Sequence, residues 1–286
     1  MTFHKPVYLV FALVLLCCSS CSKVTLAYNH GDWLLRYWIN AYTSFNARQK
    51  EEIQHEVVNY LSWHRQYALP EYIAFLQDMD VLAKRDGVIS TADIAHVRTE
   101  ISRLYRLTMT PFIRPAAHIL STLDSQQIKE LRNTLAEKSR EQRQEILPGN
   151  EQENLAKRAD KYIHFTEELV GNLSREQENR IRIMSLNVPF VTTLYMEHLE
   201  ARQAGLLSLL SNHASEDQIA AFFAQWINAE PAIASPQQQQ GIEAFDSAMD
   251  EMIARIFGLL TAEQKDHLRK KIAAYISDFQ KIHSTT

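Results

Sequence analysis

A short cassette that starts helices recurs along the whole chain and limits the folds open to it. An apolar residue is followed by Ser, Thr, Asp or Asn, then by two variable residues, and then by Gln or an acid. This spacing is typical of a capping box, in which each of the two polar side chains accepts a hydrogen bond from the other residue's backbone N–H. The predicted caps are Asn46, Ser90, Asp124, Ser174, Ser215 and Thr261. We therefore expect helices along the length of the chain.

Glycine content and apolar spacing support an all-α fold. The chain has 7 glycines in 286 residues, whereas average usage would give about 20, and hairpin-rich β folds need glycine at turns with positive φ. Apolar residues also recur at helical spacing. Two such stripes are Ile94, Val97, Ile101 and Leu104, and Leu268, Ile272, Tyr275 and Phe279. We predict an elongated helical bundle of about seven to ten helices, several of them long or kinked at proline, with no β-sheet.

Prolines and glycines divide the predicted helices. The Pro148-Gly149 pair and the stretch from Pro231 to Gly241, which contains the run Gln237–Gln240, are predicted to be loops. Three further prolines lie in apolar sequence with few turn residues, so each fits either a kink or a turn. They are Pro70, Pro111 and Pro189.

Residues 1–20 have the features of a lipoprotein signal peptide. A short positive region around Lys5 precedes an apolar run over residues 7–16, which is shorter than the roughly 20 residues of a transmembrane helix. The sequence Ser19-Ser20-Cys21 then resembles a bacterial lipobox, whose cysteine carries the lipid anchor and becomes the first mature residue. We therefore predict lipidation of Cys21 and a single all-helical domain over 21–286. A plain secretory signal is the alternative.

The residue after Cys21 and the charge of the chain bear on location and partners. Ser22, rather than Asp, follows the cysteine, and by resemblance to lipoprotein sorting signals this implies the outer membrane, on its periplasmic face. The formal net charge is -4, so the chain has no overall attraction for nucleic acid or anionic lipid. Membrane attachment is therefore expected to come from the acyl chains on Cys21.

Two acid-x-x-His pairs are candidates for a metal site, because paired motifs of this kind build di-iron sites in helical bundles. They are Glu52 with His55, and Asp93 with His96. In each helix the pair falls on the side opposite the apolar stripe, whereas a metal site in a bundle core needs ligands that point inward. Solvated helix faces are the preferred interpretation, and we expect no metal site and no cofactor.

His64 lies on the apolar stripe of its helix, within Trp63-His64-Arg65. It fits either a buried acid–base or ligand group, or a core histidine that packs beside Trp63, and the core histidine is favoured. The chain has no G-x-S-x-G, P-loop, H-E-x-x-H or G-x-G-x-x-G motif. These observations favour a protein that is not an enzyme, although a catalytic triad need not be local in sequence.

Aromatic residues crowd the first part of the chain. They form either an apolar surface that holds a partner or core packing between the first two helices. Trp33 and Trp38 differ by about 140° around a helix, so they cannot both point into one seam. We expect at least one of Trp33, Tyr37 and Trp38 to be partly exposed beside an apolar groove. The candidate binding residues are Trp33, Tyr37, Trp38, Trp63, His64 and Arg65.

Several short segments resemble one family of bacterial lipoproteins. They are the lipobox with Val24–Asn29, then Asp32, Tyr42 and Gln49, then Trp63-His64-Arg65, and Leu69–Tyr72. They are similar to DUF6279, a group of uncharacterised proteobacterial lipoproteins, and the match is most specific over residues 21–76. The resemblance implies a location and an all-α fold, with no catalytic residues. The cassettes Leu173–Gln177 and Leu260–Gln264 are also similar to those of the periplasmic Spy and CpxP chaperones.

The predicted function is that of a non-enzymatic outer-membrane lipoprotein, a helical module that binds another envelope protein or an unfolded chain as a chaperone or adaptor does. The alternative is an envelope hydrolase or a metal-binding protein built around His64. The binding protein and the enzyme require different structural features. An enzyme needs His64 in a pocket with a carboxylate or nucleophile, whereas a binding protein needs an exposed apolar concavity.

Overall fold

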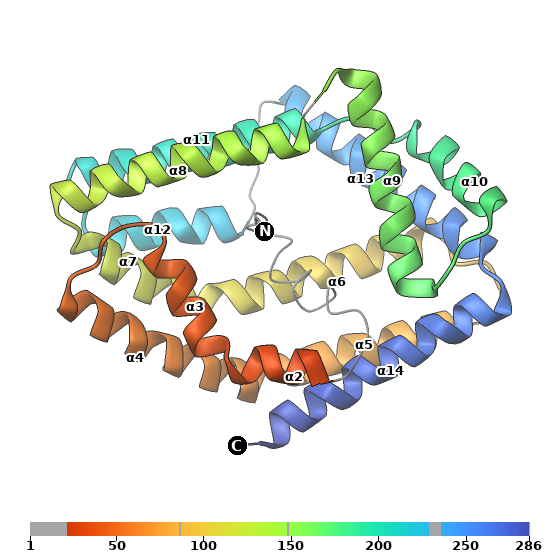
Figure 1. Cartoon of the computed structure of the whole chain (residues 1–286), viewed down its shortest axis with the longest axis horizontal. Coiled ribbons are helices and arrows are strands. Elements are labelled where there is room, and N and C mark those ends of the chain that lie inside the picture. Colours follow the sequence, from red (N-terminus) through yellow and green to blue (C-terminus); the bar gives the residue numbers. More distant parts are fainter. Residues whose placement is uncertain (1–21, 86, 148, 229–235, 286) are drawn as a thin grey trace.

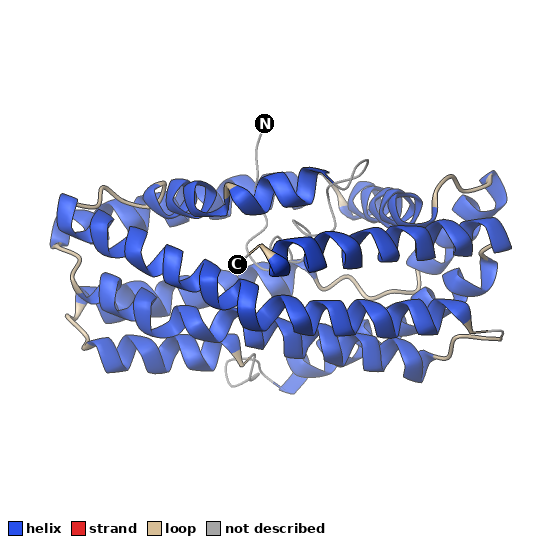
Figure 2. Ribbon diagram, turned by 90° about the horizontal axis from the view of Figure 1, so that it is seen from below, coloured by secondary structure: helices blue, strands red, loops and turns tan. Residues whose placement is uncertain are grey.

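The expected fold class is confirmed. The computed structural model describes residues 22–85, 87–147, 149–228 and 236–285, which form an elongated, all-α structure (Figure 1). In this part of the chain there are helices and connecting loops but no strand (Figure 2). The predicted signal peptide over 1–20 and the predicted lipidation site at Cys21 lie outside the described residues.

The helices are arranged in an elongated structure, and their bounds are as follows. The first half of the chain contains α2 (Ser22–Asn29), α3 (Gly31–Asn40), α4 (Ala47–Trp63), α5 (Leu69–Lys84), α6 (Thr91–Met109) and α7 (Ile113–Ser121). The second half contains α8 (Ser125–Ile146), α9 (Glu151–Val170), α10 (Arg175–Ser185), α11 (Thr192–Ser211), α12 (Glu216–Ile227), α13 (Pro236–Leu259) and α14 (Ala262–Ser284). In Figure 1, α4, α5 and α14 run along one long side, α8 and α11 lie on the opposite side, and α9, α10 and α13 close one end.

Two of these helices continue into their neighbours. A π-helix, η1 (His64–Ala68), joins α4 to α5, and a 3-10 helix, η2 (Thr110–Phe112), joins α6 to α7. With each of these joined helices counted once, the described residues form eleven helices. This is one more than the upper end of the predicted range of about seven to ten helices, because the segment before the Asn46 cap forms two helices, α2 and α3.

The three prolines whose role the sequence left open have different places. Pro70 lies in the first turn of α5, directly after η1, and Pro111 lies within η2. Both therefore modify a continuous helix rather than end it. Pro189 lies in the connection between α10 and α11, so it belongs to a turn.

All six predicted helix starts are confirmed as complete capping boxes. A seventh box, which the cassette did not reveal, starts α9 with Asn150 as the cap and Glu153 as its partner. The residue before this cap is Gly149 instead of an apolar residue. The prediction of a loop there is correct, since α8 ends at Ile146 and α9 begins at Glu151; Pro148 lies outside the described residues.

The predicted loop from Pro231 to Gly241 is wrong in its second part. Helix α13 begins at Pro236 and includes the run Gln237–Gln240. Proline is favoured at the first position of a helix, and glutamine is a good helix former. The Pro-Gln run is therefore the start of a helix, and the remaining residues of the stretch, up to 235, lie outside the described residues.

Four of the six predicted boxes also meet in pairs, through the glutamine of each box. Gln49 at the start of α4 and Gln127 at the start of α8 are 2% and 5% exposed. Each amide oxygen accepts the backbone N–H of its own cap residue, at 3.0 Å in both boxes. Each amide nitrogen donates to the partner's amide oxygen, at 3.2 Å from Gln49 and 2.7 Å from Gln127. It also donates to a backbone carbonyl two residues before the partner's cap: Thr122 O at 3.2 Å and Ser44 O at 2.9 Å.

The same arrangement recurs between α10 and α14. Gln177 and Gln264 bond reciprocally through their side-chain amides, at 2.8 and 3.1 Å. Gln177 donates to Leu259 O and Gln264 donates to Asn172 O, both at 2.8 Å. Since a buried amide is stable only when its polar groups are paired, each pair fixes the relative position of two helix starts that are distant in sequence.

Apolar packing is concentrated in three clusters. The largest joins α4, α7, α8, α11 and α12, and includes Ile53, Ala117 and Ile219. A second joins α2, η1, α5, α6 and α14 around Leu69, Leu104 and Phe279. A small third cluster contains Ile89, Ile94 and Ala254. The C-terminal helix α14 packs along α5, so the last helix of the chain lies against one of the first.

Replacing Thr261 with Ala should lower the free energy of unfolding by about 1 kcal/mol, because α14 loses one N-cap hydrogen bond. Thr261 Oγ1 accepts the backbone N–H of Gln264 at 3.2 Å. Urea unfolding followed by circular dichroism measures the change, and Thr261→Ser, which keeps the hydroxyl, is the control. An unchanged unfolding midpoint for Thr261→Ala would contradict the capping role.

Candidate functional site

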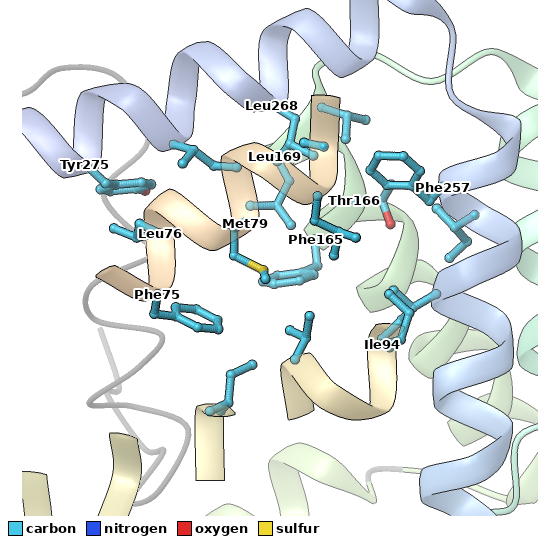
Figure 3. A pocket seen from close by; sticks show the side chains of 18 of the residues that line it. Phe75, Leu76, Met79, Ile94, Phe165, Thr166, Leu169, Phe257, Leu268 and Tyr275 are labelled. Carbon is cyan, nitrogen blue, oxygen red and sulfur yellow. The ribbon is translucent and has the colours of Figure 1, made fainter. Parts of the chain in front are cut away.

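An apolar cavity of about 370 Å³ lies between α5, α6, α9, α13 and α14. Figure 3 shows side chains from these helices converging on it, among them Met79 from α5, Phe165 from α9 and Phe257 from α13. Its volume is near the lower end of the range of about 300–1,000 Å³ that is usual for ligand sites. Two lining side chains are partly in solvent, Phe165 at 47% and Ile253 at 40% exposure, so the cavity communicates with the surface.

The walls of the cavity are built from the apolar stripes of the sequence. From α6 the predicted stripe contributes Ile94, Val97 and Ile101. From α14 it contributes Leu268, Ile272, Tyr275 and Phe279. Helix α5 adds Tyr72, Phe75, Leu76, Met79, Leu82 and Ala83, a wider set than a single helix–helix seam requires. The cavity is therefore the space that remains where five amphipathic helices converge.

The chemistry of the cavity is that of an apolar binding site. None of its lining residues is acidic, basic, His, Ser or Cys. The hydroxyl of Thr166 donates to the Tyr162 carbonyl at 2.7 Å, and that of Tyr72 bonds to the Thr108 hydroxyl. Because these two hydroxyls are already paired with protein atoms and most of the other lining side chains are apolar, the cavity is suited to apolar contact.

Ion pairs outside the cavity hold its walls together. Arg98 on α6 contacts two acids of α13, with Nη2 at 2.9 Å from Asp250 Oδ2 and Nη1 at 3.1 Å from Asp246 Oδ2. Arg269 on α14 lies with Nε at 3.3 Å from Asp80 Oδ1 on α5. These ion pairs join α6 to α13 and α5 to α14 through side chains that are not part of the cavity lining.

His64 is a buried histidine, as the favoured interpretation of the sequence predicts. It is 8% exposed and lies at the first residue of η1. Its Nδ1 is 3.1 Å from the hydroxyl of Tyr28, and the rings of Tyr28, Tyr60 and Tyr72 surround it with centroids 5.8, 5.7 and 5.4 Å away. Burial lowers the pKa of His64 to about 4, so the imidazole is neutral near pH 7. Burial also raises the pKa of Tyr28 to about 12, so its phenol keeps its proton.

The neighbours of His64 are packing groups. Arg65 lies with its guanidinium 5.5 Å from the ring centre of Tyr28, and its backbone carbonyl is 2.9 Å from Nδ1 of His283. Trp63 is half-buried and stacks on Tyr67 at 6.4 Å. Among the hydrogen bonds and ion pairs of the described residues, none joins His64 to a carboxylate. The hydrogen-bond partner that the structure gives His64 is therefore the hydroxyl of Tyr28.

The aromatic residues of α3 divide between surface and interior. Trp33 and Tyr37 are 57% and 60% exposed, and their rings stack with centroids 5.6 Å apart and planes 19° apart. Trp38 is half-buried, while Leu35 and Ile39 pack against the cluster around α4. The predicted exposure of at least one of these aromatics is confirmed. The cavity is lined by other helices than α3, so the predicted groove beside these aromatics stays a prediction.

The acid-x-x-His pairs lie on solvated faces. His55 and His96 are exposed, and Asp93 caps α6. One cluster was missed from sequence, because its members are far apart in the chain: His118 lies 2.9 Å from Glu216 and 3.8 Å from Glu52. Over the described ranges, no group of three or more His, Cys, Asp or Glu residues is placed to hold a metal ion.

The match to a known family covers most of the chain. The model of the DUF6279 family, described as a family of unknown function, matches residues 41–228. The chain belongs to the DUF6279 family. Of the segments that indicated the family, the matched region includes Tyr42, Gln49, Trp63-His64-Arg65 and Leu69–Tyr72, but not the lipobox, Val24–Asn29 or Asp32. It extends well past residue 76, the end of the range 21–76 over which the sequence resemblance is most specific.

The DUF6279 region contains three of the five helices around the cavity. Helices α5, α6 and α9 lie within it, whereas α13 and α14 follow it. No curated protein and no solved structure matches the chain. The similarity to the Spy and CpxP chaperones thus remains a prediction from the cassettes. In the portion of the chain with described structure, every helix is too short or too polar to cross a bilayer.

Proposed function

We propose that this chain is a non-enzymatic lipoprotein of the outer membrane, anchored through Cys21 on the periplasmic face, and that it binds an apolar segment of another envelope protein while that segment is unfolded. The observation that carries the proposal is the apolar cavity between α5, α6, α9, α13 and α14. A chaperone or adaptor needs such a concavity, because burial of apolar side chains provides most of its binding free energy.

The size and chemistry of the cavity favour a polypeptide segment as the ligand. A volume of about 370 Å³ accommodates a small group of apolar side chains and is too small for a folded domain. The lining has no charged group that would orient the polar end of a small metabolite. An apolar segment presented on a helix or an extended chain needs no such group, since its own backbone provides the orientation.

The surroundings of His64 support binding rather than catalysis. Its Nδ1 faces a tyrosine hydroxyl, and burial lowers the pKa of His64 to about 4, well below the value of a general base at neutral pH. The hydroxyl within hydrogen-bonding distance of this ring is that of Tyr28, and burial raises the pKa of Tyr28 to about 12, which makes the phenol a poor nucleophile near pH 7. The alternative of an enzyme or metal protein built around His64 is therefore the weaker proposal.

Ile253→Asp should remove most of the capacity of the protein to keep an unfolded chain in solution. Ile253 lines the cavity and is 40% exposed, so a carboxylate there opposes apolar binding while placing its charge partly in water. The measurement is light scattering from reduced α-lactalbumin as it aggregates, with and without the full-length protein.

Ile183→Asp is the matched control, because Ile183 on α10 is 64% exposed and lies outside the cavity. It should protect α-lactalbumin as well as the unmodified protein does, and both variants should keep the wild-type melting temperature. Equal protection by the two variants would refute the cavity as the binding site. No protection by any of the three proteins would refute the proposed chaperone function.

A further inference from the structure

The first two helices present large apolar side chains to solvent directly after the predicted lipid anchor. Leu26 on α2 is 58% exposed, and Trp33 and Tyr37 on α3 are 57% and 60% exposed. The opposite side of the same helices is packed, since Val24 belongs to the cluster around α14 while Leu35 and Ile39 pack against that around α4. The exposed side chains are thus the outward side of helices that the protein holds in place.

Trp33 and Tyr37 have the chemistry of the membrane interface. Four residues apart on α3, they share one face, and their rings are stacked. Tryptophan and tyrosine are enriched where bilayers meet water, because one end of each ring is apolar and the other is polar. Within the described residues, the ring contact of Trp33 is to Tyr37, and both side chains are more than half exposed.

A lipid on Cys21, as proposed above, would keep α3 close to the bilayer surface. Because a helix rises 1.5 Å per residue, Trp33 lies within about 20 Å of Cys21 along the chain. The chain is mildly acidic, with a formal net charge of -4, so it has no general attraction for anionic lipid. Contact with the membrane beyond the acyl chains must then come from apolar and aromatic side chains.

We infer that α3 rests on the bilayer surface, with Trp33 and Tyr37 in the headgroup region of the lipid. The inference rests on the proposed anchor at Cys21 and adds an orientation to it: the face of α3 that carries these two rings is turned to the membrane. A short lipid tether alone would leave the protein free to rotate about it. A second point of contact at α3 would fix the orientation of the protein on the membrane, and with it the side of the protein that faces the periplasm.

The test is quenching of tryptophan fluorescence by phosphatidylcholine with brominated acyl chains. The full-length lipidated protein is purified in detergent and reconstituted into vesicles of phosphatidylcholine and phosphatidylethanolamine. Brominated lipid should quench the protein's fluorescence, and Trp33→Phe should lose most of that quenching. The matched control is Trp226→Phe, since Trp226 on α12 is half-buried against the rings of Phe222 and Phe223 and is the last of the four tryptophans in the sequence. It should leave the quenching of the remaining tryptophans intact.

Two further measurements separate this inference from the proposed anchor. Mass spectrometry of the N-terminal peptide detects acyl chains on Cys21, and flotation on a sucrose gradient detects attachment to vesicles. Acylated protein that floats but shows equal quenching with and without Trp33 would overturn the inference and leave the anchor in place; a protein partner would then be the occupant of this face. A peptide without acyl chains would overturn both.

Discussion

Lowering the pH from 7.5 to 4.5 should reduce the free energy of unfolding by roughly 2 to 3 kcal/mol through His64 alone. In the folded protein, burial lowers the pKa of His64 to about 4 from an ordinary value of 6.5. Between these two values the unfolded chain binds a proton that the folded chain does not bind, so protonation favours the unfolded state. The stabilisation is complete above about pH 6.5 and is lost as the pH falls toward 4.

The three tyrosines around His64 do not titrate between pH 4.5 and 7.5, because burial raises the pKa of each. The residues around the ring are Tyr28, Tyr60 and Tyr72, whose pKa values burial raises, and Arg65. Urea unfolding at both pH values for the wild type and His64→Gln measures the effect, and the variant should lose less stability on acidification. His55→Gln, at an exposed histidine of α4, controls for the loss of a histidine. An equal loss of stability in the wild type and His64→Gln would contradict the prediction.

Gln127→Ala should lower the free energy of unfolding by about 3 kcal/mol, far more than an ordinary cap substitution. The change removes one partner of the Gln49 amide, which keeps its bonds to Thr122 and Asn46, and it leaves the Ser44 carbonyl and the Asp124 N–H without these hydrogen bonds. Gln49 is 2% exposed, so water cannot replace the lost partner without a local rearrangement. Each buried polar group that loses its partner costs about 1–3 kcal/mol.

The chain contains its own control for this experiment. Gln218 forms the same box with Ser215, with its oxygen 2.8 Å from the cap N–H, but it is exposed and belongs to neither pair. Gln218→Ala should therefore cost only about 0.5–1 kcal/mol. The double substitution of Gln49 and Gln127 should cost less than the sum of the two single changes, by about 1–2 kcal/mol. Additive single changes, or equal costs for Gln127→Ala and Gln218→Ala, would show that pairing contributes nothing.

The features that could be predicted from sequence are those determined within one or two helical turns. The six caps were found because a capping box is complete in four residues. The stripes of α6 and α14 were found because helical spacing alone places their residues on one face. The burial of His64 followed from its place on such a stripe. The angle between Trp33 and Trp38 predicted that at least one aromatic of α3 is exposed, but not which one.

Features that depend on which helices meet could not be predicted in this way. The pairing of Gln49 with Gln127 joins residues 78 positions apart, and the sequence of each cassette contains no information about which other cassette it contacts. The cavity needs five helices from both halves of the chain, so no single stripe reveals it. Tyr28 was seen only as one aromatic among many, although it is the hydrogen-bond partner of His64. One sequence feature did indicate the cavity: the apolar residues of α5 cover a wider arc of the helix than contact with a single neighbouring helix requires.

The packing of α14 along α5 sets the order in which the molecule can be completed. Arg269 and Asp80 are 189 residues apart, and contacts of such long range form slowly, although the entropy of closing a long loop rises only gradually with its length. While the chain is being made, α5 emerges early and must wait for residues 262–284 before its apolar side is covered. Until then the nascent protein exposes the apolar side chains of α5 that later line the cavity, and the cavity itself is not yet formed. A chain that stops before α14 would therefore be both an incomplete fold and a candidate for the aggregation that the finished protein is proposed to prevent.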